Sequence, residues 1–173
     1  MKLAKVFKEN KQFTLFSILA LVVVGVAVFA PQIAPYDPLD AVMLESLQAP
    51  SSAHLFGTDK LGRDLLSRVI FGTRTSLIMT LCLVAVIFVI GTFLGVIAGY
   101  FGGIVDGVIM RIADMMISFP GLVLAIAIAG MLGPNLVNAV ISIAAVSWTK
   151  YARLARSLVM KIRDRDYVEE PLY

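Results

Sequence analysis

The sequence is poor in the residues from which catalytic and metal sites are most often built. Its 173 residues include one cysteine and one histidine. A single cysteine, Cys82, cannot form an internal disulfide, and a thiol inside an apolar segment behaves as a small hydrophobic residue. A single histidine, His54, is too few for a metal site built from histidine and cysteine. The sequence therefore predicts no enzyme, no catalytic residue and no cofactor or metal bound by this chain.

Charged residues are also scarce. They make up 16% of the chain, whereas hydrophobic residues make up 59%; a typical soluble domain has about 25% charged residues. The apolar residues occur in blocks long enough to cross a bilayer, which takes about 20 helical residues. This predicts an all-α integral membrane protein. The net charge is +3, and the basic residues lie beside the apolar blocks. This position indicates that they orient the chain in a membrane rather than bind nucleic acid.

Four segments are predicted to span the membrane, and they cover residues 13–30, 76–100, 109–132 and 136–150. Residues 1–12 precede the first span, residues 31–75 form a long loop, and residues 151–173 form a basic amphipathic helix. A signal peptide is the alternative for the first span. Its apolar run is longer than the usual core of about 7–15 residues, and cleavage after Ala30 would fall directly before Pro31.

The end of the long loop is dense in mixed charge. Thr58 or Asp59 is a suitable N-cap, and leucine, valine and isoleucine recur at helical spacing over residues 61–70. We predict an amphipathic helix that lies at the membrane interface. Asp59, Arg63 and Asp64 would form salt bridges on this helix, brace the loop, or contact a partner outside the membrane.

The second and third spans carry two features of helix packing. Gly91, Gly95 and Gly99 recur at four-residue spacing, so they line one helix face and let another backbone approach closely. Pro120, beside Gly121, predicts a kink or break in the third span. The kink serves either helix packing or a transport pathway.

The basic residues are unevenly distributed around these spans. Four precede the first span, and six lie from Lys150 onward. The four in the long loop are offset by five acidic residues. The positive-inside rule therefore places both termini in the cytoplasm and the loop 31–75 outside. At the start of the third span, Arg111 and Asp114 are expected to pair across one helical turn at the interface; the alternative is a role in a transport pathway.

Three stretches of the sequence resemble a known family of transport proteins. They are FGTDKLGRDLLSRVIFGTRTSL at 56–77, GYFGGIVDGVIMRIADMMISFPGLVLAI at 99–126, and SWTKYARLARSLVMKIRDRDYVE at 147–169. Together they resemble binding-protein-dependent ABC importer permeases, and specifically the C-type subunit of the dipeptide, oligopeptide and nickel group. The resemblance covers nearly the whole chain from about residue 30, with the motifs in the family's order.

The resemblance implies a type I importer permease fold, which normally has six spans, with a permease domain at about residues 76–173. It also implies the partners: a second homologous permease, two ATPase subunits that bind ATP, and an extracytoplasmic solute-binding protein. The chain lacks a GxxxxGK[ST] phosphate loop of its own. The expected function is import of di- or oligopeptides, nickel or other metal complexes across a bacterial or archaeal plasma membrane. The alternative is a four-span membrane interaction or assembly protein without transport activity.

The resemblance also concerns the coupling to the ATPases. Family members carry a docking motif similar to YVxAARxxG, and Tyr167, Val168 and Glu169 match its opening. Pro171 then replaces a residue of the helical continuation and would break the helix. Because ATPase closure must reach the spans through a rigid contact, we expect a truncated subunit, impaired when alone. Asp59, Arg63 and Asp64 are the candidate contacts for the solute-binding protein on the outer side.

Overall fold

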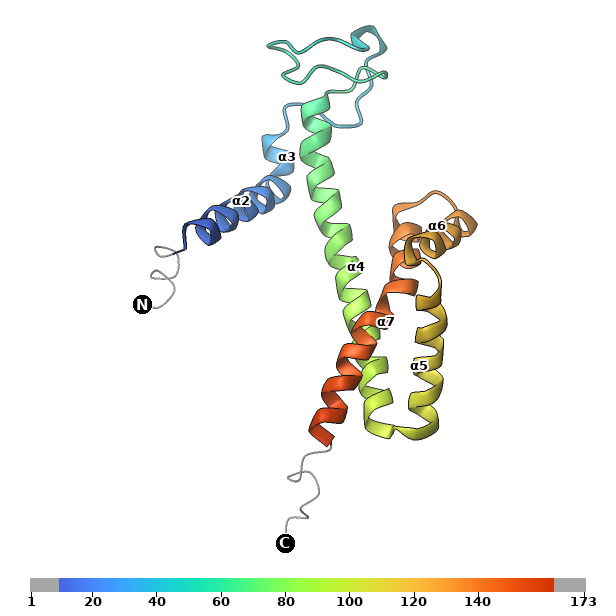
Figure 1. Cartoon of the computed structure of the whole chain (residues 1–173). Coiled ribbons are helices and arrows are strands. Elements are labelled where there is room, and N and C mark those ends of the chain that lie inside the picture. The colour runs from blue at the N-terminus through green and yellow to red at the C-terminus, as the bar shows by residue number, and fades with distance from the viewer. Residues whose placement is uncertain (1–9, 164–173) are drawn as a thin grey trace. The chain divides into compact units, whose positions relative to one another are not determined.

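The structure of the chain, a computed structural model, describes residues 10–163 (Figure 1). These residues form helices joined by turns and one long loop, without a β-strand among them. The elements are, in chain order, α2 Lys11–Val28, α3 Ala30–Ile33, the 3-10 helix η1 Met43–Glu45, α4 Leu65–Phe101, α5 Gly103–Ser118, α6 Gly121–Leu132 and α7 Leu136–Arg163. The chain divides into two compact units, Met1–Ile78 and Met79–Tyr173. The prediction of an all-α protein is confirmed for the described residues.

The first unit begins with the apolar helix α2. Its 18 residues contain no charge after Lys11, and most of its apolar side chains are exposed, as expected of a helix whose neighbour is lipid. α2 ends at Val28 with Phe29 as its C-cap, and the short α3 follows with Pro31 in its first turn. Proline is tolerated there because its missing N–H would have had no partner in the helix. The first predicted span thus corresponds to α2 and the start of α3.

The prediction of an amphipathic helix starting at Thr58 or Asp59 is wrong. Residues 57–64 instead form a turn closed by an isolated bridge between Thr58 and Asp64. The Asp59 carboxylate accepts hydrogen bonds from the backbone N–H groups of Leu61 and Arg63, at 2.8 and 3.1 Å. Such local side-chain bonds compete with helix formation. Gly62 has a φ of +74°, a left-handed conformation that a helix cannot contain.

α4 begins at Leu65, immediately after this turn, and continues into the predicted second span. Its 37 residues correspond to about 55 Å at 1.5 Å per residue, whereas a bilayer core is about 30 Å thick. The residues predicted to form a separate interfacial helix are therefore the first turns of a long helix that exceeds one membrane thickness.

The predicted third span is divided into two helices. α5 begins at Gly103, six residues before the predicted boundary of 109, because a single residue, Gly102 at φ +62°, makes the turn from α4. α5 ends at Ser118 and α6 begins at Gly121, and the two helices differ in direction by 92°. Pro120 lies at this break, where its ring cannot be accommodated within a continuous helix.

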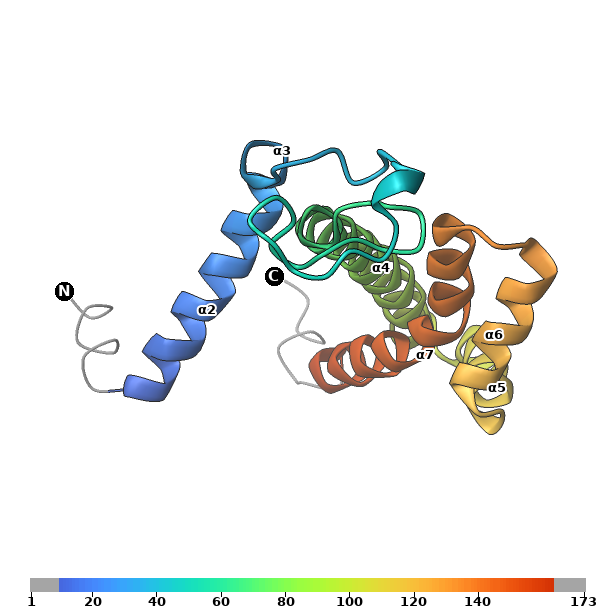
Figure 2. The same ribbon diagram turned by 90° about the horizontal axis from the view of Figure 1, so that it is seen from above.

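α7 contains the predicted fourth span and continues as one helix to Arg163. In both views it lies beside α6 (Figures 1 and 2). Among the described residues, α2 and α4 are each long and apolar enough to cross a membrane, and the bent pair α5–α6 provides a third candidate. The apolar part of α7 is interrupted at Lys150. The structure thus supports two or three spans by length and composition, and the number four is not confirmed.

The second half of α4 packs closely against α7. A Cβ atom built on Gly91 would lie 2.6 Å from the Trp148 carbonyl oxygen, and one on Gly95 would lie 2.3 Å from that of Ala152. A Cβ on Gly99 would lie 2.8 Å from the Cβ of Val159. These distances are shorter than van der Waals contact, so the three glycines set how close the two backbones come. We call this contact the glycine seam.

The glycine seam predicts a contrast between two substitutions in the same helix. Gly95→Ala is expected to destabilise the fold by about 1–3 kcal/mol, since the added methyl group must push α7 away. Gly72→Ala is the matched control because nothing lies within 4 Å of its Cβ position. It should be neutral or stabilising by up to about 1 kcal/mol through higher helix propensity. Unfolding by SDS in mixed micelles, followed by the fluorescence of the single tryptophan, measures both. Equal effects of the two substitutions would contradict the close packing.

Candidate functional site: ion pairs and a cavity around α7

Two ion pairs join α5 to α7. In the first, the Arg156 guanidinium donates to both carboxylate oxygens of Asp106, through Nε and Nη2. Asp106 lies in the first turn of α5, where a negative charge is stabilised by the helix dipole. The Asp106 side chain is 17% exposed and the Arg156 side chain is 31% exposed. A two-pronged, partly buried pair of this kind fixes orientation as well as distance.

The second ion pair lies nearer the C-terminal end of α5. Arg153 Nη2 donates to Asp114 Oδ1 at 2.5 Å, and both side chains are exposed, at 45% and 58%. The expected pairing of Asp114 with Arg111 is therefore replaced by a pairing between helices. The two pairs run in antiparallel order, since the earlier acid meets the later arginine.

A third arginine of α7 contacts the end of α4. Arg163 Nη1 lies 3.3 Å from the carbonyl oxygen of Gly99 and 3.4 Å from that of Tyr100. These carbonyls belong to the last turn of α4, where helix hydrogen bonding leaves acceptors without partners. A cation at this end also interacts favourably with the helix dipole. α7 is therefore held to α4 by the glycine seam and by Arg163, and to α5 by two ion pairs.

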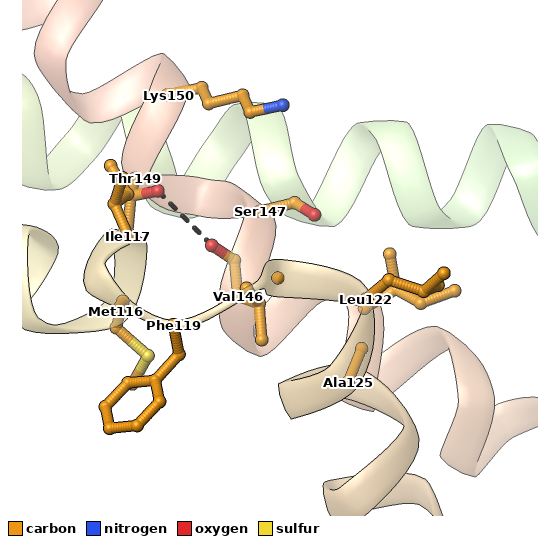
Figure 3. A pocket seen from close by; sticks show the side chains of 11 residues that line it. Met116, Ile117, Phe119, Leu122, Ala125, Val146, Ser147, Thr149 and Lys150 are labelled. Atoms are coloured by element: carbon orange, nitrogen blue, oxygen red, sulfur yellow. Dashed lines mark hydrogen bonds between the residues drawn. The ribbon is translucent and has the colours of Figure 1, made fainter.

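A cavity of about 340 Å³ opens at the break between α5 and α6 (Figure 3). Its walls come from the end of α5, the start of α6 and the middle of α7. The lining residues are Met116, Ile117, Phe119, Gly121, Leu122, Ala125, Ile143, Val146, Ser147, Thr149 and Lys150.

The lining is mostly apolar, with its polar groups confined to α7. Thr149 Oγ1 donates to the Val146 carbonyl at 3.2 Å (Figure 3), which leaves Ser147 and Lys150 as the polar groups that can meet a ligand. They lie three residues apart and hence on one helix face. The lining contains no carboxylate, imidazole or thiol, the groups that bind a bare metal ion. The cavity suits an apolar group that carries an anionic or hydrogen-bonding end.

The three residues predicted as outward contacts are engaged within the loop. Arg63 Nε and Nη2 both lie 2.8 Å from Asp59 Oδ2, and Arg68 Nη1 is 3.5 Å from the same atom. The hydrogen bond from Arg63, opposed by partial burial, lowers the pKa of Asp59 to about 2. Asp64 is buried and accepts hydrogen bonds from the N–H and Oγ of Ser67, both at 2.7 Å.

The remaining predicted residues are placed as follows. Gly91, Gly95 and Gly99 face α7, and Pro120 lies at the α5–α6 break beside the cavity. Tyr167, Val168 and Glu169, the predicted lead-in to the ATPase contact, lie outside the described residues.

Two known protein families match this chain. Residues 91–169 match the binding-protein-dependent transport system inner membrane component, a segment that contains both partners of each ion pair and the whole cavity. Residues 2–50 match the N-terminal TM domain of oligopeptide transport permease C. Since both matches describe permeases of binding-protein-dependent importers, the chain belongs to this family of permeases. The resemblance stated from the sequence is confirmed, and the protein is a membrane protein.

The similar proteins are permeases with several named substrates. The dipeptide transport system permease protein DppC of Haemophilus influenzae is 40% identical over 168 residues, which are 94% of this chain and 57% of the relative. The di/tripeptide transport system permease protein DppC of Pseudomonas aeruginosa is 44% identical over 168 residues, 94% of this chain and 55% of the relative. The nickel transport system permease protein NikC of Escherichia coli is 41% identical over 134 residues, 78% of this chain and 48% of the relative. The chain thus spans about half the length of the permeases it matches.

Sequence reasoning missed Asp106, Arg153 and Arg156 as a set. Each lies in a stretch that carries the family resemblance, but the charges were assigned to helix ends and to membrane orientation. The sequence does carry a signal for these pairs: α5 has two acidic residues and α7 has two arginines. Such residues can pair when the two helices run antiparallel. Spacing along one helix, which suggested Arg111 with Asp114, does not reveal a pairing between helices.

The two ion pairs are expected to differ in strength. Asp106→Asn should lower the free energy of unfolding by about 1.5–3 kcal/mol, because it removes a charge-assisted partner from a half-buried guanidinium. Asp114→Asn should cost less than about 1 kcal/mol, since that pair is exposed and screened by water. The same micelle unfolding assay measures both variants. A larger loss for Asp114→Asn would contradict this ranking.

Proposed function

We propose that this chain is an inner-membrane permease subunit of an ABC importer that moves peptides, or a metal ion enclosed in an organic ligand, into the cell. Family membership supports the transport role. The substrate class follows the names of similar proteins, which transport dipeptides, tripeptides and nickel. ATP hydrolysis would belong to separate subunits, since the sequence has no phosphate-binding loop.

The attachment of α7 is the observation that carries this proposal. α7 is held on one side by the glycine seam and Arg163, and on the other by the pairs Asp106–Arg156 and Asp114–Arg153. A helix fixed at several points along its length moves as one body with its neighbours. A displacement at its C-terminal end would therefore reach the cavity, where Val146 lies 3.4 Å from a Cβ built on Gly121.

The proposed orientation places the C-terminal end of α7 in the cytoplasm. Lys161 and Arg163 lie in its last turn, and an excess of Lys and Arg favours the cytoplasmic side. Four spans then follow from α2, α4, the bent pair α5–α6 and α7, with both termini inside and the loop 31–75 outside. Beyond Arg163 the chain continues towards Tyr167, Val168 and Glu169, which we propose as the lead-in to the ATPase contact.

The cavity is the proposed part of the translocation path contributed by this chain. Its apolar walls accommodate an aliphatic or aromatic side chain, and Lys150 offers a positive charge for a carboxylate. A bare cation would find none of its usual ligands there. This lining supports a peptide, or a metal held in an organic ligand, as the substrate.

The outer loop has a bracing role in this proposal. Asp64 is buried and bonded to the start of α4, and Asp59 is paired with Arg63 and Arg68. These contacts lie within the loop or join it to the first turns of α4. A second homologous permease, two ATPase subunits and an extracytoplasmic solute-binding protein are the partners we propose on family grounds.

Affinity purification of the tagged chain from membranes of its own host tests the proposal. We expect a second permease and an ATPase subunit to co-purify, with less of both for Gly95→Ala and unchanged amounts for Gly72→Ala. A full-length permease purified in the same detergent is the positive control. Recovery of the chain without these partners, when the control retains them, would contradict the proposal and favour a membrane interaction protein without transport activity.

A further inference from the structure

His54 lies at the centre of the outer loop, between two carboxylates. His54 is buried, with 5% of its surface exposed. Nδ1 lies 3.0 Å from Asp64 Oδ1, and Nε2 lies 3.3 Å from Glu45 Oε2. Each ring nitrogen therefore faces a group that, when ionised, can only accept a hydrogen bond.

The same cluster joins three parts of the first unit. The Tyr36 ring packs against the imidazole with ring centres 4.8 Å apart. The Tyr36 hydroxyl donates to the Ala53 carbonyl at 2.9 Å, and its backbone N–H donates to Ser67 Oγ at 3.1 Å. Residues after α3, the middle of the loop and the first turn of α4 thus meet around one imidazole.

The protonation state of His54 decides how many of these contacts are satisfied. A neutral imidazole has one N–H donor, whereas the imidazolium has two. Both carboxylates receive a hydrogen bond from the ring only when it is charged. Asp64 is the more firmly held of the two, because its second oxygen accepts two bonds from Ser67. Glu45 has a side chain that is 42% exposed, so it is the contact that a neutral ring would lose.

We propose that His54 is a pH-sensitive latch, closed when the imidazolium binds Glu45 and Asp64 together, and open when the neutral ring keeps Asp64 and releases Glu45. Opening releases the Glu45 side chain of the η1 segment, Met43–Glu45, from the imidazole, while the Glu45 carbonyl keeps its hydrogen bond from Thr58. The inference concerns the chain by itself and does not depend on its having a transport function.

The surrounding charges favour the protonated ring and hence the closed state. Asp37 and Asp40 line the same small cavity as His54, Glu45 and Asp64, so all the charged groups that line it besides the ring are acidic. The hydrogen bond to Asp64, opposed by burial and assisted by Glu45, raises the pKa of His54. Burial disfavours the Asp64 carboxylate, yet hydrogen bonds from Ser67 and His54 lower its pKa overall.

These shifts fix the direction of the pH dependence. Since the pKa of His54 is raised on folding, its stabilising effect is complete below the ordinary value of about 6.5 and is lost as pH rises through the higher value. Since the pKa of Asp64 is lowered, its effect is complete above about 3.9 and is lost only in stronger acid. The latch is therefore closed below about 6.5, and it opens as pH rises through the raised pKa of His54.

The single histidine makes a direct experiment possible. With isotope-labelled histidine, NMR of the chain in detergent micelles follows one imidazole through its titration. The midpoint should lie above 6.5. Glu45→Gln should lower it, whereas Asp59→Asn, which alters a loop carboxylate paired with Arg63, should leave it unchanged.

Hydrogen exchange reports how firmly the backbone around His54 is held in each state. The N–H groups of Ser51 and Gly57 donate to the His54 carbonyl at 2.8 and 2.9 Å. Corrected for intrinsic exchange rates, their protection should fall about tenfold as the ring deprotonates, the order expected for one lost charge-assisted hydrogen bond. His54→Gln should abolish this step.

Three outcomes would overturn the latch. They are a midpoint at or below 6.5, equal shifts for Glu45→Gln and Asp59→Asn, and an unchanged pH step in His54→Gln. Because none of these readouts involves uptake or partner subunits, failure of the proposed transport role would leave the result intact.

Discussion

The close contact between α4 and α7 is the constraint on which the second unit depends. Gly91, Gly95 and Gly99 remove three side chains from one face of α4, and the backbone of α7 occupies the space. In a membrane, association between helices cannot rely on the hydrophobic effect, because lipid is as apolar as the side chains. Dispersion contacts between closely packed backbones provide the attraction instead. The seam therefore sets the position of α7, to which the other contacts are attached.

Polar contacts then determine which way α7 faces. Asp106 and Asp114 of α5 meet Arg156 and Arg153, and Arg163 reaches the last carbonyls of α4. The break around Pro120 turns α6 away from α5. It leaves a mostly apolar cavity that α7 closes on one side. The ion pairs and the cavity thus belong to one assembly of helices.

Much of the helical part could be predicted from the sequence, because apolar length and glycine spacing are properties of single segments. The all-α class, the end of α4 near residue 100 and the start of α7 near residue 136 followed from such patterns, whereas the family followed from the resemblance of three motif stretches. Two features did not. The turn at 57–64 depends on Asp59 bonding to its own backbone and on Gly62 at positive φ, which an apolar periodicity masked. The pairing of Asp114 with Arg153 is a contact between helices, and spacing along one helix suggested Arg111 instead.

Cysteine cross-linking in membranes tests the contact between α4 and α7 most directly. The rings of Phe88 and Tyr151 lie 6.1 Å apart, edge to face, so cysteines at these two positions should be joined by a short bifunctional thiol reagent in a Cys82→Ser background. Cysteines at Val89 and Tyr151 are the control, since the next residue points about 100° away around α4. Efficient cross-linking of the first pair alone is the predicted result. Equal cross-linking of both pairs, or of neither, would contradict the packing of α7 against α4.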